Sequence, residues 1–223
     1  MKLRNSLITK IVATAISLAA IAGLNKQSEG EGLTLSPTIE YEYWILGDEF
    51  KYEHKTHPAD QVFLDGGPGE TSIKSAHALK VGMDVSKKLG KNGLFEPYIG
   101  GAGMYVFGED RHDNDNDPRP SGKNSRVYSK LFPLAPQFEA GLKLNPFKKF
   151  SVAASSSTTY LIVEHGWDRF GKDQEASNES KIFFNVGGKL EYLCDDFWKI
   201  GGGYSKGINS ESSYFSFGAS YNF

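Results

Sequence analysis

The sequence predicts an all-β protein, an eight-stranded antiparallel up-and-down transmembrane β-barrel. Three observations predict this fold: apolar and polar residues alternate with period two, eight segments have the length of a strand, and the connections between them alternate between short and long. The alternation is clearest in the final segment, Ser213 to Phe223. There every second residue from Phe215 onward is apolar, and the residues between them are mostly small or polar, as in a strand with one apolar face.

Composition limits the classes of protein. The chain has 223 residues, enough for one domain. Its charged fraction of 23% and mean hydropathy of −0.41 would suit a soluble protein, but a membrane barrel has the same values because half of each strand faces a polar interior. The net charge of −2 argues against a nucleic-acid partner, which would require a basic surface.

The amino-terminal residues form a separate unit. Three basic residues precede an apolar run from Ile11 to Ala22, and Ala20-Ile21-Ala22 matches a signal-peptidase cleavage pattern. The alternative is a membrane helix, but the run is shorter than the roughly 20 apolar residues that a span needs. The sequence therefore predicts an exported protein with a signal peptide at 1–22, a short periplasmic leader at 23–32 and a barrel domain at 33–223.

The remaining chain divides into strands and connections. The predicted strands are 33–46, 76–89, 95–107, 133–145, 150–164, 180–193, 197–206 and 213–223. Their lengths suit tilted strands that cross a bilayer with about 9 to 11 residues each. The connections 91–94, 146–149 and 194–196 are short, those at 47–75, 108–132 and 165–179 are long and hydrophilic, and 207–212 is intermediate. This alternation predicts periplasmic turns at one rim, extracellular loops at the other, and both termini in the periplasm.

The two faces of the strands differ in charge. One face carries apolar residues and no charge, whereas the other combines glycines with both signs of charge. In a narrow lumen, buried charges must pair to offset the cost of losing water. The predicted lumen charge network contains Glu40, Glu42, Lys80, Asp84, Glu139, Lys143, Lys189, Glu191 and Lys199. The alternation in strands 95–107 and 150–164 leaves their facing ambiguous.

Aromatic residues favour a membrane barrel over a soluble, lipocalin-like barrel with its apolar face inward. On the apolar face they gather near both strand ends, which predicts two interfacial girdles. The predicted periplasmic girdle is Tyr98, Phe150, Tyr192, Trp198, Tyr221 and Phe223; the predicted outer girdle is Tyr41, Tyr43, Phe138, Tyr160, Phe184, Tyr204 and Phe215.

The eight-strand plan, the export signal, the segment FEPYIGGAGMYVF at 95–107 and the terminal SYNF resemble the small barrels of the outer-membrane protein A, protein X and opacity-protein group. The resemblance implies a Gram-negative outer membrane, with lipid, lipopolysaccharide and a host or cell-surface ligand as partners. It also implies that the barrel-assembly machinery reads the closing strand, so that Tyr221 and Phe223 form an assembly signal.

The sequence predicts no catalytic constellation and no cofactor. Some barrels of this size modify lipid A with a His-x-Ser pair and a carboxylate, and none of the five histidines fits that arrangement. His54, His57, His77, His112 and His165 are therefore interpreted as solvated loop residues.

The segment from Asp113 to Asp117 has the alternating carboxylates of a calcium loop. The match ends there, because Pro118 and Asn124 occupy the positions where an EF-hand has Gly and Glu. Asp113, Asp115 and Asp117 are thus weak metal candidates.

Three functions remain open. The first is a non-enzymatic outer-membrane protein with a structural and adhesin-like role through its long loops. The second is a lipid-A-modifying enzyme. The third is a narrow pore, which the crowded lumen of an eight-stranded barrel disfavours.

Overall fold

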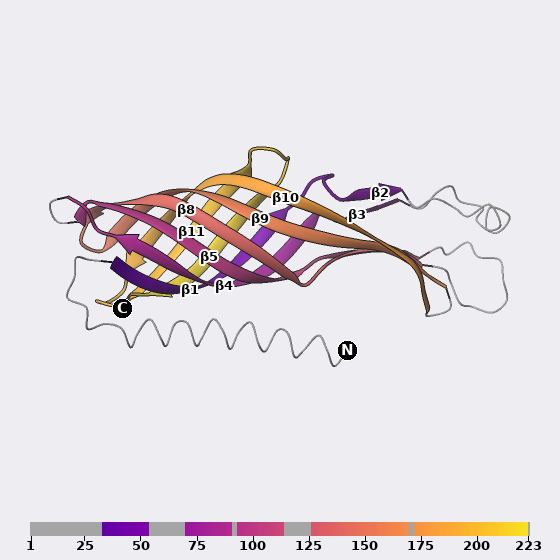
Figure 1. The fold of residues 1–223 in the computed structure, drawn as a ribbon, viewed down its shortest axis with the longest axis horizontal. Coiled ribbons are helices and arrows are strands. Elements are labelled where there is room, and N and C mark those ends of the chain that lie inside the picture. Colours follow the sequence, from indigo (N-terminus) through magenta and orange to yellow (C-terminus); the bar gives the residue numbers. More distant parts are fainter. Residues whose placement is uncertain (1–32, 54–69, 91–92, 114–125, 170–171, 223) are drawn as a thin grey trace.

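The computed structural model is a closed antiparallel barrel of eight strands, which confirms the predicted fold class (Figure 1). It describes residues 33–53, 70–90, 93–113, 126–169 and 172–222. The predicted signal peptide and leader lie outside these residues. The barrel strands are β1 (Leu33–Ile45), β4 (Ser75–Lys87), β5 (Phe95–Phe107), β8 (Leu134–Phe147), β9 (Phe150–Arg169), β10 (Lys172–Leu193), β11 (Trp198–Gly207) and β12 (Ser213–Tyr221).

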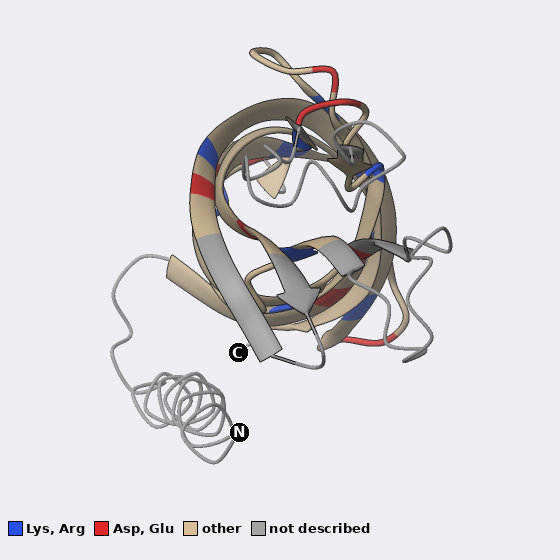
Figure 2. Cartoon of the chain, turned by 90° about the vertical axis from the view of Figure 1, so that its right-hand side faces the viewer, with Lys and Arg blue, Asp and Glu red and all other residues tan. Residues whose placement is uncertain are grey.

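Each barrel strand pairs with two neighbours. The order is β10-β11-β12-β1-β4-β5-β8-β9, and β9 pairs with β10 to close the ring. Viewed along its axis, the barrel appears as a ring with charged residues distributed around it (Figure 2). Every predicted strand overlaps one barrel strand. No helix long and apolar enough to cross a membrane occurs among the described residues.

The two ends of the barrel differ. At one end, here called the short-turn end, lie the start of β1, the end of β12 and the short connections; the opposite end is called the long-loop end. Beyond the long-loop end, β9 and β10 continue as a hairpin, and β7 (Arg126–Leu131) and β6 (Glu109–Asp113) extend the sheet from β9. We call this extension, formed by β6, β7 and the outer parts of β9 and β10, the protruding sheet. A separate hairpin of β2 (Lys51–Glu53) and β3 (Glu70–Ser72) lies beside this sheet (Figure 1).

This protruding sheet corrects one prediction. The segment 165–179 was predicted to be a long hydrophilic connection, but β9 and β10 remain paired from Arg169 and Lys172 down to Phe150 and Tyr192. The physical reason is that pairing satisfies the backbone N–H and C=O groups of both chains, even where the side chains are hydrophilic.

Local chemistry shapes the short turns. Gly90 and Gly93 adopt positive φ angles of 79° and 66°, a region that favours glycine. In the turn between β10 and β11, the Asp195 carboxylate accepts hydrogen bonds from the backbone N–H groups of Phe197 at 2.8 Å and Trp198 at 2.7 Å. These two hydrogen bonds stabilise the charged form and hold the pKa of Asp195 below its ordinary value.

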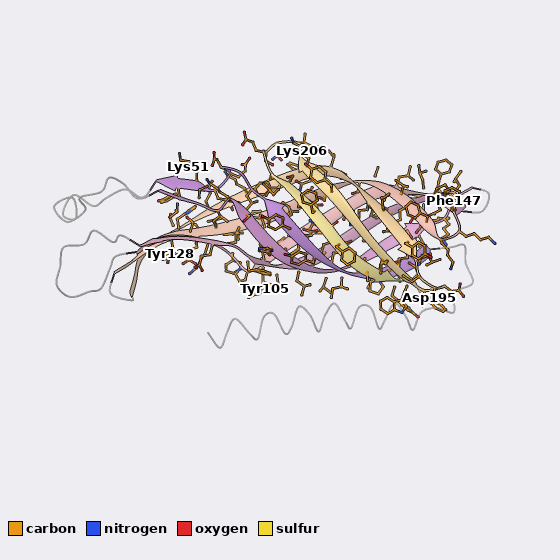
Figure 3. All side chains as sticks on the ribbon, turned by 180° about the vertical axis from the view of Figure 1, so that it is seen from behind. Lys51, Tyr105, Tyr128, Phe147, Asp195 and Lys206 are labelled. Carbon is orange, nitrogen blue, oxygen red and sulfur yellow. The ribbon has the colours of Figure 1, made fainter. Side chains whose placement is uncertain are left out.

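The exterior of the barrel is apolar. Ile99, Phe138 and Phe217 point outward and are 65%, 66% and 65% exposed. Aromatic side chains such as Tyr105 and Phe147 project from the barrel wall (Figure 3). Most of the predicted girdle residues also face outward: Tyr41, Phe138, Phe150, Tyr160, Phe184, Tyr192, Trp198, Tyr204 and Phe215 are all exposed.

Tyr98 is the exception among the girdle residues that the structure describes, and its predicted outward facing is wrong. It is only 4% exposed and lies in the interior. The adjacent outward positions of β5 are Pro97 and Ile99, so the even-numbered residues of this strand face inward, where Tyr98 reaches a carboxylate.

The interior is filled by side chains, and small inward-facing residues leave the space that these side chains occupy. A Cβ atom added at Gly187 would lie 2.0 Å from the Ser205 hydroxyl and 2.4 Å from the Tyr204 carbonyl oxygen. At Gly101, on the outer surface, it would approach only the Phe138 ring, at 3.8 Å.

We therefore expect Gly187→Ala to lower the free energy of unfolding by about 1 to 3 kcal/mol, because the clash with a backbone carbonyl forces neighbouring strands apart. Gly101→Ala serves as the matched control and should change stability by about 0.5 kcal/mol or less. Urea unfolding in lipid vesicles, followed by tryptophan fluorescence, measures both. Equal losses in the two variants would contradict this account of the interior.

Candidate functional site: the charged barrel interior

Four charged side chains meet at the centre of the lumen, and we call them the central quartet: Glu40, Lys80, Glu139 and Lys189. The ammonium group of Lys80 lies 2.9 Å from Glu40 and 3.1 Å from Glu139. That of Lys189 lies 2.9 Å from Glu40 and 3.2 Å from Glu139. Each ammonium thus contacts both carboxylates, so the charges alternate in sign around the quartet.

The four residues of the quartet come from four different strands. Glu40 of β1 and Lys80 of β4 are directly opposite each other across one strand pair. Glu139 comes from β8 and Lys189 from β10, so their contacts with Lys80 and Glu40 connect strands that are not neighbours in the sheet. All four side chains are 15% exposed or less. Charges this deeply buried must be paired to offset the loss of hydration.

Two aromatic residues add hydrogen bonds to the acidic groups. The Tyr98 hydroxyl donates to Glu139 at 2.7 Å, and the Trp44 indole N–H donates to Glu42 at 2.8 Å. Glu42 is fully buried, and its other oxygen lies 3.7 Å from the Lys80 ammonium. These contacts connect Glu42 to the quartet at the side that faces the long-loop end.

A second charged group lies nearer the short-turn end. Lys143 pairs with Glu191 at 3.1 Å, and Ser151 donates to the same carboxylate at 3.3 Å. Glu96, which the sequence did not assign to the lumen, accepts hydrogen bonds from Ser86 at 2.7 Å and Asn145 at 3.1 Å. No clear signal in the sequence identifies Glu96, because the glycines at the centre of β5 obscure the alternation between its two faces.

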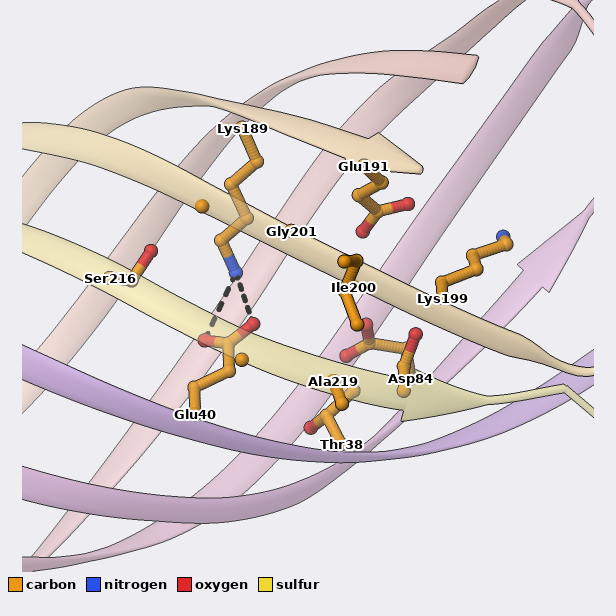
Figure 4. Close-up of a pocket in the computed structure, with 13 residues that line it drawn as sticks. Thr38, Glu40, Asp84, Lys189, Glu191, Lys199, Ile200, Gly201, Ser216 and Ala219 are labelled. Carbon is orange, nitrogen blue, oxygen red and sulfur yellow. Dashed lines mark hydrogen bonds and ion pairs between the residues drawn. The ribbon is translucent and has the colours of Figure 1, made fainter. Parts of the chain in front are cut away.

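Asp84 and Lys199 complete the predicted network, but neither forms an ion pair with another described residue. Both line a cavity of about 20 Å³ beside Glu40 and Lys189 (Figure 4). A cavity of this size has room for about one water molecule. The structure thus brings seven of the nine predicted residues into ion pairs and leaves these two beside a water-sized space.

Above the quartet, towards the long-loop end, the interior contains a layer of apolar residues beside buried polar ones such as Gln137 and Asn185. Trp44 stacks on Tyr214 with ring centroids 4.5 Å apart and meets the edge of Phe183 at 6.1 Å. This apolar layer, which sequence reasoning missed, consists of Trp44, Leu46, Phe50, Ile73, Ala76, Ala78, Met104, Val106, Leu131, Ala135, Leu161, Val163, Phe183 and Tyr214. Trp44 and Leu46 lie at alternate positions after Glu40 and Glu42, so they face the interior like those two residues. This alternation is the signal that could have located the layer.

Two of the histidines are not solvated loop residues, contrary to the prediction. His77 lies on the outer surface of β4, where it hydrogen-bonds the Tyr41 hydroxyl and stacks on Phe107 at 5.4 Å. His165 lies in the protruding part of β9 and is 1% exposed. The prediction for His165 was wrong because the segment 165–179 was treated as a loop. His54 and His57 lie outside the described residues, as does the side chain of His112.

His165 has the contacts of a proton relay. Its Nδ1 lies 2.6 Å from the Ser129 hydroxyl, and its Nε2 lies 3.3 Å from a Glu179 oxygen. Ser129 has no exposed surface and also contacts the Thr71 hydroxyl at 2.5 Å. The serine therefore cannot reach a substrate in this conformation, and the contacts serve to hold segments together.

Most of the residues predicted as metal ligands or as the assembly signal lie outside the residues that the structure describes. The backbone of Asp113 ends β6, but its side chain, like Asp115 and Asp117, is not described. The part of the chain that is described contains no group of three or more His, Cys, Asp or Glu residues that could hold a metal ion. Tyr221 ends β12 and packs edge-on against Trp198 at 5.1 Å, whereas Phe223 is not described.

Comparisons with known proteins gave structural similarity alone. No protein-family model and no curated protein sequence matches the chain. The solved structure of Ail from Yersinia pestis, in complex with the heparin analogue sucrose octasulfate, is similar at 14% identity and a TM-score of 0.47, covering 87% of this chain and 100% of that one. Neisserial surface protein A has 9% identity and a TM-score of 0.37, covering 87% and 98% of the two chains.

A third similar structure is the amino-terminal barrel domain of OprF from Pseudomonas aeruginosa, with 8% identity, a TM-score of 0.37 and coverage of 87% and 100%. Overlaps this loose say nothing about activity. The fold assignment rests instead on the strand pairing of the chain itself.

Removing one cation of the quartet should be costly. We expect Lys189→Met to destabilise the folded barrel by about 3 to 5 kcal/mol, because two buried carboxylates are then left with Lys80 alone. Lys206→Met, which changes an exposed lysine on the neighbouring strand, is the control and should cost about 0.5 kcal/mol or less. Urea unfolding measures both, and a Lys189→Met, Glu40→Gln double variant should recover part of the loss because its charges balance again.

Proposed function

We propose that the chain is a non-enzymatic β-barrel protein of a Gram-negative outer membrane, whose body is closed to solutes and whose long-loop end makes contacts at the cell surface. The observation that carries the proposal is that the same eight strands have a mostly apolar exterior, with Lys206 exposed near the long-loop end, and a filled, ion-paired interior. A soluble barrel has the reverse arrangement.

The exterior supports membrane insertion. Along β5 the outward positions run from Phe95 to Phe107 without a charge, and along β12 they run from Phe215 to Tyr221 without one. Soluble monomers rarely expose apolar patches larger than a few hundred Å². An apolar band that encircles a closed barrel instead matches a hydrocarbon layer, and closure leaves no unpaired strand edge inside it.

The orientation that fits best has the long-loop end outside the cell. An even number of strands places both ends of the barrel chain at the short-turn end, which would then face the periplasm. The protruding sheet and the β2–β3 hairpin would be the surface available to lipopolysaccharide or a host ligand. A predicted export signal at 1–22 is consistent with this route.

The interior argues against an open pore. The central quartet spans the lumen from β1, β4, β8 and β10, and the apolar layer fills the space above it. The cavity beside the quartet, at about 20 Å³, is too small for a solute larger than water. Purified protein in planar bilayers should therefore give no stable ion conductance.

The relay at His165 does not favour an enzyme. Its serine has no exposed surface and contacts the Thr71 hydroxyl, so a substrate would not reach it in this conformation. Lipid A from cells with and without the protein should have the same mass spectrum.

Location and orientation can be tested together. An epitope inserted at Asn116 should be accessible to antibody on intact cells, whereas one inserted in the turn at 91–94 should become accessible only after the outer membrane is permeabilised. Both variants should fractionate with the outer membrane. The opposite pattern would invert the orientation, and recovery of folded protein in the soluble fraction would exclude the membrane assignment.

The assembly role of the closing strand gives a separate prediction. Phe223→Ser should lower the amount of barrel in the outer membrane at matched expression, because the assembly machinery would lose a recognised terminal aromatic residue. The folded fraction should keep near-normal thermal stability, since one strand-end aromatic contributes only about 1.5 to 3 kcal/mol of apolar burial. Tyr105→Ser, an outward aromatic change on another strand, controls for the loss of one exposed ring. Unchanged yield of Phe223→Ser would contradict the assembly role.

A further inference from the structure

One sector of the short-turn end carries only basic exposed charge. The turn between β4 and β5 and the turn between β8 and β9 are neighbours on this rim, because β5 and β8 are paired. Among the described residues of these turns, 87–90, 93–95 and 144–150, there is no Asp or Glu. Four lysines lie there, three of them exposed and Lys87 half-buried, and we call them the basic sector: Lys87, Lys88, Lys148 and Lys149.

Hydrogen bonds join the two turns into one surface. The backbone N–H of Asn145 donates to the Leu94 carbonyl oxygen at 2.9 Å, and its side-chain amide donates to the Gly93 carbonyl oxygen at 2.9 Å. A Cβ atom added at Gly93 would lie 3.1 Å from Cδ of Lys88, so the stem of this lysine lies against the turn. The lysines of both turns are therefore presented side by side by a hydrogen-bonded backbone.

The charge of the basic sector is not neutralised within the described chain. None of its four ammonium groups forms an ion pair with a described residue, whereas the lumen lysines of the central quartet do. Exposed acidic residues lie in a different turn, between β10 and β11, at Asp195 and Asp196. Phe147, the residue before Lys148, and Asp195 lie at separate points of the short-turn end (Figure 3). The rim thus has a basic side and an acidic side.

An apolar wall adjoins the basic sector. Phe95 of β5 and Leu144 of β8 are directly opposite each other in the sheet and are 45% and 40% exposed, and Phe147 is 71% exposed. An occupant that matches both surfaces must combine a negative head with an apolar tail. A soluble acidic protein would leave the wall in contact with water, whereas an anionic phospholipid would cover the wall and neutralise the lysines.

We propose that the basic sector binds an anionic glycerophospholipid of the periplasmic leaflet, with the headgroup phosphate against the lysines and the acyl chains along Phe95 and Leu144. The inference rests on the proposed function, which places this rim at that leaflet. Lysine suits the role because its flexible stem can lie along apolar surface while its ammonium reaches the headgroup. Asp195 and Asp196 repel the same headgroup, so binding is confined to one side of the barrel.

Native mass spectrometry of the protein purified from outer membranes, in detergent micelles, tests this inference. Phosphatidylglycerol should bind more tightly than zwitterionic phosphatidylcholine by about fivefold for each lysine that contacts the headgroup. Raising ammonium acetate from about 0.05 M to about 0.5 M should weaken the binding of phosphatidylglycerol and leave that of phosphatidylcholine unchanged, because salt screens exposed charges.

The decisive variant is Lys148→Gln, Lys149→Gln, which should lose most of the preference for phosphatidylglycerol. Lys88→Gln, on the other turn, should lose about fivefold. The matched control is Lys206→Gln, an exposed lysine near the long-loop end, which should keep the full preference. All variants should retain the heat-dependent gel migration of a folded barrel, which separates loss of binding from loss of fold.

Three results would overturn the inference: equal binding of the two lipids by the unmodified barrel, an unchanged preference in the variants of the basic sector, or an equal loss in Lys206→Gln. The last result would show that the preference follows the net charge of the protein. Absence of the chain from the outer membrane would contradict the proposed function instead, so the two failures are distinguishable.

Discussion

The pairing of buried charge across the lumen is the constraint on which the rest of this barrel depends. Glu40 and Lys80 belong to adjacent strands, but each must also reach a partner from the opposite wall, Lys189 or Glu139. A slip of one residue in any strand would turn its charge outward and its apolar side chain inward. The quartet and the apolar exterior therefore select the same register, one by attraction inside and the other by burial outside.

The division of the interior into a charged part and an apolar layer reinforces that constraint. Trp44 belongs to both parts, since its indole N–H donates to Glu42 while its ring stacks on Tyr214. By excluding water from one side of the quartet, the aromatic rings lower the local dielectric, which strengthens ion pairs and makes an unpaired charge more costly. The same packing fills the lumen, so the stability of the barrel and its proposed closure to solutes would have one structural origin.

Residue parity explains what the sequence could and could not predict. Alternation was enough to place Glu40, Lys80, Glu139 and Lys189 on one face, because inward and outward positions differ by one residue. It could not place Tyr98 or Glu96, since Gly101 and Gly103 leave the outward face of β5 without large side chains at its centre. Which charges meet also depends on the stagger between distant strands, and no local pattern encodes that stagger.

The protruding sheet shows why hydrophilic composition misled the prediction of loops. Residues 172–180 are mostly polar, yet they continue β10 because β9 pairs with them, and β7 in turn pairs with β9. Outside a membrane the side chains need no apolar face, while the backbone still gains from a ladder. Side chains such as Glu164 and Lys130, which pair at 3.0 Å on this sheet, are consequently presented by a hydrogen-bonded framework. A ligand at this end would meet a surface whose shape is set by strand pairing.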